Sequence, residues 1–268
     1  MELRTEPLRG GSGEAHMRRD EEIFLSMESD PATASPDARV PLLRLYLWDE
    51  PTVSLGRGQT HEVALAPRWE KWRKDPSSDP LGPAAVVKRP TGGRAVWHQD
   101  ELTYSVVFPL DHPVFLEGRR GPEEFFGAWL LESGRRAGIE DLTLERGGSS
   151  RDPLGLGPAP CFASTSRHEL KWRGMKWVGS ARRLGKVSLL QHGSIRLGPG
   201  GDRLETWLTG VRPLDHRPWQ KLPSPQVLAS HLADTLLDWI LAEGTSEKSQ
   251  AIHPIHRAKN PINSVFTG

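Results

Sequence analysis

The sequence contains a single cysteine, Cys161, and a lone thiol can act as a nucleophile when a nearby cation stabilises its thiolate. Cys161 follows a stretch rich in glycine and proline, residues 147–160. His168, Lys171 and Lys176 all lie within fifteen residues of it, and each can carry a positive charge. Sequence distance alone does not choose among them. A free cysteine is also commonly a small buried apolar residue, so a packing role stays open.

Lys176 stands between Met175 and Trp177 in a segment typical of a β-strand. A half-buried lysine favours a counter-charge, which a thiolate or a carboxylate supplies. The ordinary alternative is a lysine on the solvated face of the strand. Small residues follow in the same strand pattern, and they indicate a place where another chain or a ligand comes close: Gly179, Ser180 and Ala181.

A glycine pair between two predicted strands is a further candidate. Gly92 and Gly93 allow backbone N–H groups to approach a ligand closely. Arg89 and Arg94 flank the pair and are suited to bind phosphate or a carboxylate. The alternative is an ordinary Gly-Gly hairpin with solvated arginines. The segment matches neither a Walker loop nor a dinucleotide fingerprint.

His192 and Gly193 lie in another strand pattern, where the histidine can serve as a base or simply as a structural residue. Three histidines of the C-terminal third, His216, His253 and His256, show no metal-ligand spacing. A single cysteine excludes a cysteine-rich zinc site and an intramolecular disulfide. We therefore expect no metal.

The elements that must position these residues can be predicted from hydrophobic periodicity and turn residues. Helices are predicted over residues 16–27, 122–137 and from 224 to 243. Strands are predicted over residues 40–48, 52–56, 84–88, 94–98, 102–108, 141–145, 168–172, 176–181 and 186–196. This pattern predicts an α+β fold with mixed, mostly antiparallel sheets flanked by helices. We expect a flexible lead over residues 1–13, one catalytic domain over 14–244 and a loosely packed tail over 245–268.

Composition narrows the function classes. The chain has 268 residues, with 35 Lys and Arg against 34 Asp and Glu, a net charge of +1. Such a balance leaves no broad electrostatic footprint for nucleic acid. Its apolar stretches are too short to span a bilayer, and the N-terminus has no apolar core typical of a secretory signal. The expected location is the cytoplasm, where a reduced cysteine is ordinary.

In order along the chain, the motifs resemble those of the superfamily of lipoate ligases and octanoyltransferases, which also includes the biotin protein ligases. The resemblance runs from about residue 17 to 197 and is greatest to the LipM-type octanoyltransferases. It is carried by segments such as RPTGGRAVWH (89–98), DELTYSV (100–106), GMKWVGSA (174–181) and LLQHGSI (189–195), together with the Met17–Asp20 helix opening. It implies a lipoate/biotin protein ligase-like catalytic domain.

The resemblance implies an acyltransferase that moves an octanoyl group from octanoyl-acyl carrier protein to a lysine of a lipoyl domain. LipM-type members carry a nucleophilic cysteine followed fifteen residues later by a lysine, which here are Cys161 and Lys176. The acceptor would be a lipoyl protein such as the glycine cleavage H protein or a 2-oxoacid dehydrogenase acyltransferase subunit. The implied substrate-binding residues are Arg89, Thr91, Gly92, Gly93, Arg94, Ala95, His98, Gly179, Ser180, Ala181, His192 and Gly193. No ATP, metal or other cofactor is implied.

Other readings stay open. ATP-dependent lipoate or octanoate ligases need no cysteine and carry an Asn-Asp pair near where this chain has Cys161. An octanoyl amidotransferase would use Cys161 but take its acyl group from a lipoyl protein. A catalytically inactive member would bind acyl domains without turnover. The sequence departs from the LipM pattern at Trp97, where a smaller aliphatic residue is usual, and at Arg182, which stands in place of Gln.

Overall fold

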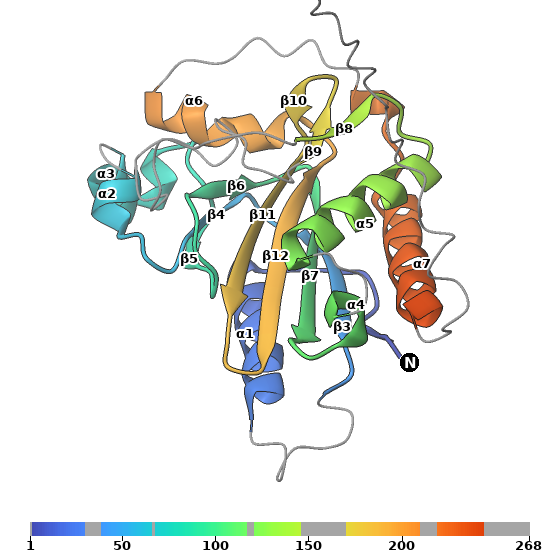
Figure 1. The fold of residues 1–268 in the computed structure, drawn as a ribbon. Helices are drawn as coiled ribbons and strands as arrows, with labels where there is room; N and C mark the ends of the chain where they lie inside the picture. Colours follow the sequence, from blue (N-terminus) through green and yellow to red (C-terminus); the bar gives the residue numbers. More distant parts are fainter. Residues whose placement is uncertain are drawn as a thin grey trace, which may run out of the picture.

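A six-stranded sheet forms the centre of the molecule in the computed structural model, which describes residues 2–29, 39–65, 68–116, 121–145, 170–209 and 219–243 (Figure 1). The strand order is β1-β3-β7-β12-β11, and β2 also pairs with β3. β3, β7, β12 and β11 are antiparallel neighbours, whereas β1 and β2 run parallel to β3. The strands are β1 (Arg4–Thr5), β2 (Arg9–Gly11), β3 (Leu42–Trp48), β7 (Glu101–Pro109), β11 (Val178–Leu184) and β12 (Ser188–Arg196).

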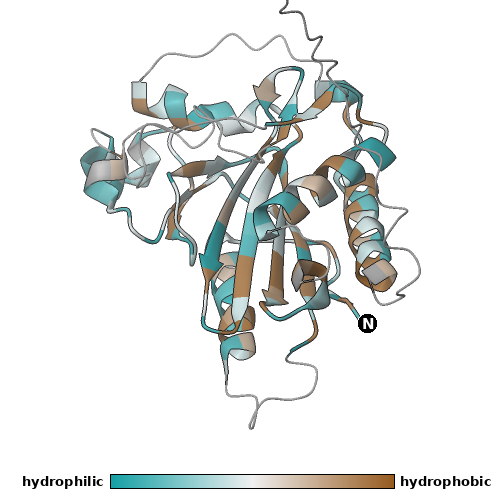
Figure 2. Cartoon of the chain, in the orientation of Figure 1, coloured by the Kyte–Doolittle hydropathy of each residue, from teal (hydrophilic) through white to brown (hydrophobic). Residues whose placement is uncertain are grey.

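The two faces of this sheet differ in character although every residue of β7 and β12 is buried. Successive side chains of a strand point to opposite faces, so the register sorts them into two sets. One face carries Leu102, Tyr104, Val106 and Phe108 beside Leu189 and Ile195. The other carries Glu101, Thr103 and Ser105 beside His192, Ser194 and Arg196. In Figure 2 hydrophilic residues accordingly interrupt the hydrophobic ones along β11 and β12.

The apolar face is covered by two long helices, α5 (Pro122–Arg136) and α7 (Pro225–Glu243), which lie together on one side of the sheet (Figure 1). Pro122 stands in the first turn of α5, where its fixed φ suits a helix start. Trp129 of α5 is fully buried, and its indole Nε1 donates to the carbonyl oxygen of Leu232 in α7 at 2.9 Å. This face therefore holds the main hydrophobic core.

The polar face is covered by helix α1 (Gly13–Glu28), which packs on β7, β12 and β5. Ser12 caps α1 by accepting a hydrogen bond from the backbone N–H of Ala15. The buried stripe of α1 has helical spacing and mixes apolar with polar residues: Gly13, His16, Met17, Asp20, Ile23, Phe24 and Met27.

A three-stranded sheet completes the cover of the polar face. Its order is β5-β4-β6, from β4 (Thr52–Leu55), β5 (Ala85–Lys88) and β6 (Val96–His98). β5 runs parallel to β4 and β6 antiparallel to it. Beside this sheet lie the short helices α2 (His61–Leu65), α3 (Trp69–Lys74) and α6 (Arg203–Thr209), with 3₁₀ turns η2 (Pro76–Ser78) and η4 (Pro199–Asp202) (Figure 1).

A third sheet, β10-β9-β8, stands at one end of the central sheet (Figure 1). It consists of β8 (Leu142–Leu144), β9 (Leu170–Trp172) and β10 (Met175–Lys176). Arg173 and Gly174 both have positive φ and form the tight turn between β9 and β10. The remaining described elements are helix α4 (Pro113–Leu116) and the 3₁₀ turn η5 (Trp219–Lys221).

The predicted α+β class with mixed, mostly antiparallel sheets is confirmed, as are the three long helices. The flexible lead predicted for residues 1–13 is wrong, because β1 and β2 form backbone pairs along the open edge of β3. The Gly-Gly hairpin alternative for residues 92–93 is also wrong, because β4 lies between β5 and β6. The predicted tail, residues 245–268, lies outside the described residues. Within the described ranges, no helix is long and apolar enough to cross a membrane.

Candidate active site

A narrow cavity of about 40 Å³ lies on the polar face of the central sheet. We call it the acyl cavity, after the octanoyl chain that the sequence resemblance implies as its ligand. It collects residues from α1, β3, β4, β6, β7, β11 and β12, which the register brings side by side. Eight of the predicted substrate-binding residues line it: Arg89, Gly93, His98, Gly179, Ser180, Ala181, His192 and Gly193. Seven further residues complete the wall: Met17, Tyr46, Trp48, Ser54, Val96, Thr103 and Ser194.

The other four predicted binding residues lie next to the cavity without lining it. Thr91 is fully buried and its Oγ1 is 2.5 Å from His192 Nε2. Gly92 and Arg94 offer their carbonyl oxygens to Arg89. Ala95 packs into the small core between the three-stranded sheet and α6. These residues pack behind the residues that line the cavity.

His192 is held on both ring nitrogens. Its Nδ1 lies 3.1 Å from Asp20 Oδ2, and its Nε2 faces the Thr91 hydroxyl. Burial lowers the pKa of His192 below its ordinary value, although the bond to Asp20 opposes this. A neutral ring that donates from Nδ1 to Asp20 and accepts from Thr91 satisfies all three groups. His192 is therefore a fixed, neutral part of the wall.

Asp20 is fully buried and anchors the network behind His192. It also accepts from Arg44 Nη1 and, at 3.0 Å, from the Tyr46 hydroxyl. Burial alone would raise the pKa of Asp20, but the His192 bond and the Arg44 charge outweigh it and lower the pKa. Arg44 in turn donates from Nε to Glu6 at 2.7 Å. Glu6, in the N-terminal segment, thus contributes a negative charge to the network that holds His192.

His98 forms a second network on the same face. Its Nε2 is 2.6 Å from Ser54 Oγ and its Nδ1 is 2.8 Å from Glu101 Oε1. Thr103 Oγ1 donates to the same Glu101 oxygen at 2.7 Å and accepts from Trp48 Nε1 at 2.8 Å. The Trp48 ring stacks on His98 with 3.9 Å between ring centroids. The position and orientation of His98 are therefore set by β3, β4 and β7 together.

Arg89 does not present its charge as a ligand-binding fork, which corrects the expectation that it binds phosphate or a carboxylate. Its Nη1 donates to Ser54 O at 2.9 Å and to Ser54 Oγ at 3.2 Å. Its Nε and Nη2 donate to Gly92 O, and Nη2 also donates to Arg94 O at 2.6 Å. A guanidinium has five N–H donors, and these bonds occupy all of them. Arg89 fastens the 92–94 turn to β4.

Two glycines are required by close approaches at the cavity. Gly93 has φ +88°, and a Cβ there would lie 2.9 Å from Arg89 Nη2. Gly193 faces the neighbouring strand so closely that a Cβ would lie 2.6 Å from the carbonyl oxygen of Gly179. The same Cβ would lie 2.7 Å from Tyr104 Cε1, so Gly193 is required by close packing on the apolar face of the sheet.

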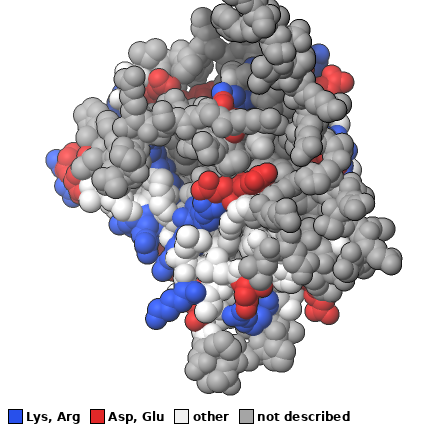
Figure 3. All heavy atoms as spheres, in the orientation of Figure 1, with Lys and Arg blue, Asp and Glu red and all other residues white. Residues whose placement is uncertain are grey.

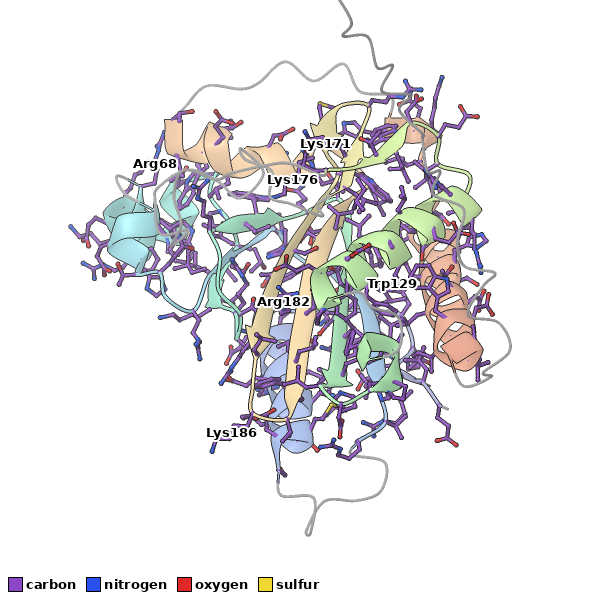
Figure 4. The ribbon with its side chains drawn as sticks, viewed as in Figure 1. Arg68, Trp129, Lys171, Lys176, Arg182 and Lys186 are labelled. Carbon is purple, nitrogen blue, oxygen red and sulfur yellow. The ribbon has the colours of Figure 1, made fainter. Side chains whose placement is uncertain are left out.

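Lys176 lies in β10, opposite Lys171 in the register, and is only 8% exposed. The solvated alternative for Lys176 is thus wrong. The chain runs from Lys176 through Trp177 into β11, whose residues 179–181 line the acyl cavity. Lys171 is ion-paired with Glu145. Figure 4 shows Lys171 and Lys176 at the end of the β11–β12 hairpin opposite Lys186. Cys161 and His168 lie outside the described residues.

A family model for the lipoyl protein ligase A/B catalytic domain matches residues 14–225. This chain belongs to that family. It is 40% identical over 167 residues to a protein of Moorella thermoacetica named octanoyltransferase LipM, an alignment that covers 61% of this chain and 56% of that protein. A protein of the same name from Macrococcus caseolyticus is 33% identical over 177 residues, which cover 64% and 61% of the two chains. The chain thus spans little more than half the length of these relatives.

Solved structures of the family share the fold. A crystal structure of lipoate-protein ligase A bound with ATP superposes with a TM-score of 0.57, covering 90% of this chain and 86% of the other at 18% identity. At this identity the likeness concerns the fold alone. It supports the lipoate/biotin protein ligase-like architecture that the sequence motifs implied.

The sequence did not predict the role of the charged and polar residues whose side chains are buried behind the site. Asp20 stands at a core position of the α1 stripe, and Glu101 alternates with the apolar residues of β7. Helical spacing would have placed His16 and Asp20 on the same buried face of the helix as Met17. Among the described residues, no group of three or more His, Cys, Asp or Glu has the arrangement of a metal site.

Proposed function

We propose that this chain is an octanoyltransferase that moves an octanoyl group from octanoyl-acyl carrier protein to a lysine of a lipoyl domain through a thioester on Cys161. The similarity to proteins named octanoyltransferase LipM supports the reaction class. The observation that carries the proposal is the buried Lys176, fifteen positions after the only cysteine and two residues before β11, which lines the acyl cavity. A buried ammonium favours the thiolate of a cysteine near it.

The proposed reaction has two steps. In the first, the Cys161 thiolate attacks the donor carbonyl carbon, the new C–S bond forms, and the bond to the phosphopantetheine sulfur breaks. The departing thiolate takes up a proton. In the second, the neutral acceptor amine attacks the octanoyl thioester, a C–N bond forms, and the C–S bond to Cys161 breaks. The nitrogen loses its extra proton to solvent and the Cys161 thiolate is regenerated.

The donor thioester is less stable than the product amide, so the transfer needs neither ATP nor a metal. The acyl chain would lie in the acyl cavity, against Val96, Ala181 and the glycines of β11 and β12. Because an eight-carbon chain is larger than this narrow space, we expect the flexible Met17 side chain to change rotamer when the chain enters. Both protein substrates are expected in the cytoplasm.

The test is intact mass spectrometry of the purified protein with octanoyl-acyl carrier protein and no ATP. We expect a mass gain of one octanoyl group, about 126 Da, that hydroxylamine removes. Cys161→Ala should abolish the adduct, and Lys176→Ala should slow its formation at least about tenfold. Lys186→Ala is the matched control, because Lys186 is an exposed lysine at the end of the β11–β12 hairpin opposite Lys176 (Figure 4).

Other outcomes would change the assignment. ATP-dependent labelling of a lipoyl domain by free octanoate or lipoate, unaffected by Cys161→Ala, would make the chain a ligase. An adduct formed only from an octanoylated lipoyl protein would make it an amidotransferase. Binding of a lipoyl domain without any adduct or turnover would indicate an inactive binding subunit.

A further inference from the structure

A second, larger cavity of about 550 Å³ lies at the end of β3, β7 and β12, beside the acyl cavity. This acidic cavity is lined by Asp100 and Glu101 at the start of β7, by the indoles of Trp48 and Trp219, and by Leu197 and Pro199. Its volume is in the range of small-ligand sites. No Lys or Arg is among its described lining residues. Two carboxylates between two indoles favour a cation with an apolar stem.

Glu101 is the buried member of the pair, with a side chain only 1% exposed. Its Oε1 is bonded to His98 and Thr103. Its Oε2 is buried and has no hydrogen-bond partner among the described residues. Arg196, opposite Glu101 in the register, forms an ion pair with Asp202 at 2.6 Å, and its guanidinium lies 5.1 Å from the centre of the Trp219 ring. A buried carboxylate oxygen without a donor is costly, so this atom indicates a ligand that supplies N–H groups.

Asp100 stands at the exposed rim of the acidic cavity. Its φ of +53° is unusual for a residue other than glycine. The Leu197 N–H donates to the Asp100 carbonyl oxygen at 2.8 Å, and Gly198 packs so closely that a Cβ there would lie 2.6 Å from Asp100 Cβ. The chain thus holds one carboxylate at the entrance and the next one inside.

The acidic cavity and the acyl cavity share a wall. Trp48 lines both of them. His98 lines the acyl cavity and is bonded to Glu101, which lines the acidic one. A group that binds at Glu101 is therefore separated from the acyl cavity only by the stacked Trp48 and His98 rings.

We propose that the acidic cavity binds the side chain of the acceptor lysine before transfer, with Glu101 receiving its ammonium group and Asp100 attracting it at the rim; the lysine then leaves Glu101 and attacks the thioester as the neutral amine. This inference rests on the proposed function, because it assigns the second substrate of that reaction. A lysine has the required chemistry: three N–H donors, a positive charge and an apolar stem that fits between indoles. The phosphopantetheine arm of the donor carries a phosphate, which the two carboxylates would repel.

The decisive experiment is a double-mutant cycle on binding. The affinity of the unacylated enzyme is measured for a lipoyl domain and for the same domain with its acceptor lysine replaced by alanine. Glu101→Gln preserves the shape, and the Gln Oε1 can still accept from His98 and Thr103. It should weaken binding of the lysine-bearing domain by about tenfold and leave the alanine domain unchanged. Glu140→Gln is the control, because Glu140 is exposed and away from both cavities.

The two half-reactions separate this inference from the proposed function. Glu101→Gln should slow transfer of the octanoyl group to the lipoyl domain about tenfold more than it slows formation of octanoyl-Cys161. Equal loss for the lysine and alanine domains, or no loss at all, would overturn the inference. Absence of the wild-type acyl-enzyme would instead refute the proposed function, while the binding cycle would still decide the lysine site. If Glu101→Gln does not fold, Asp100→Asn replaces it in the binding cycle. It should weaken binding of the lysine-bearing domain by about threefold and leave binding of the alanine domain unchanged.

Discussion

The two faces of the central sheet are built from the same strands, yet one holds a hydrophobic core and the other a polar site. On one face Tyr104, Phe108 and Ile195 pack against α5 and α7. On the other, Ser105, His192 and Ser194 line or support the acyl cavity under α1. Alternation along a strand assigns each neighbouring residue to one face or the other.

The difference lies in how buried groups are satisfied. The apolar face removes side-chain surface from water and gains stability in proportion to that area. The polar face buries Asp20 and Glu101, which are expensive unless paired. Its hydrogen bonds therefore mainly offset the cost of burial and fix the geometry of the site. We expect the apolar face to carry most of the stability and the polar face most of the chemistry.

Charges on the outside of the molecule do not show a similar division. In Figure 3 acidic and basic side chains are interspersed over the described part of the visible face, in keeping with the net charge of +1. Pairs such as Arg182–Glu123 and Arg136–Asp238 join elements at the surface. Exposed pairs of this kind contribute little to stability. The contrast that matters for function is inside.

The largest effect is expected from the apolar face. Trp129→Ala removes a fully buried indole and its bond to Leu232 O, and should lower the free energy of unfolding by about 4 kcal/mol. Urea denaturation followed by circular dichroism measures this change. Leu241→Ala, at an exposed position of α7, should change it by less than about 0.5 kcal/mol. Octanoyl transfer per folded molecule should stay within about twofold, and a large selective loss would refute the division between the faces.

On the polar face, substitution of a glycine should cause a smaller loss of stability than Trp129→Ala and a larger loss of activity. Two neighbouring glycines test this. Gly93→Ala places a Cβ in a left-handed conformation, 2.9 Å from Arg89 Nη2, and should cost about 1–2 kcal/mol. Because Arg89 holds the turn to β4, transfer should also fall by about tenfold. Gly92→Ala meets nothing within 4 Å and should change stability by less than about 0.5 kcal/mol. Equal losses of stability and of transfer in Gly92→Ala and Gly93→Ala would show that the turn does not require glycine at residue 93.

Much of this arrangement could be predicted from sequence because it depends on local periodicity. The apolar stripes of residues 122–137 and 224–243 and the β-rich runs of 102–108 and 186–196 appear as α5, α7, β7 and β12. The predicted binding residues come from motifs, and the register then places Gly179–Ala181 beside His192–Gly193. Long-range pairing was not predictable in this way. β4 inserts between β5 and β6, and β1 and β2 are too short to show a period.

The networks behind the site were not predictable for a different reason. A charged residue is usually exposed, so Asp20 and Glu101 gave no signal until the partners that stabilise their burial were known. Arg89 was predicted as a ligand-binding residue from its type and its neighbouring glycines. The carbonyl groups that occupy its donors come from residues 54, 92 and 94, and only the fold brings the first of these to it.

The smallest effect concerns pH and tests whether the polar face keeps His192 neutral. Burial lowers the pKa of His16 and His192, whereas in the unfolded chain both titrate at about 6.5. As pH falls below that value, the unfolded chain binds protons that the folded chain excludes, so the free energy of unfolding should decrease. Each such histidine contributes at most about 1.4 kcal/mol per pH unit. Asp20, whose pKa is lowered from its ordinary value, contributes the same sign only at more acidic pH.

His192→Asn isolates this contribution, because its amide can still donate to Asp20 but does not titrate. Urea unfolding between pH 8 and pH 5 should give a flatter dependence in the variant than in the wild type, whatever the absolute stability of each. His231→Asn is the control, since His231 lies on α7 outside the polar face. An unchanged slope in His192→Asn would mean that folding does not lower the pKa of His192, and a steeper dependence in the variant would mean that His192 is protonated in the folded state. The polar face would then hold a charged Asp20–His192 pair instead of a neutral ring.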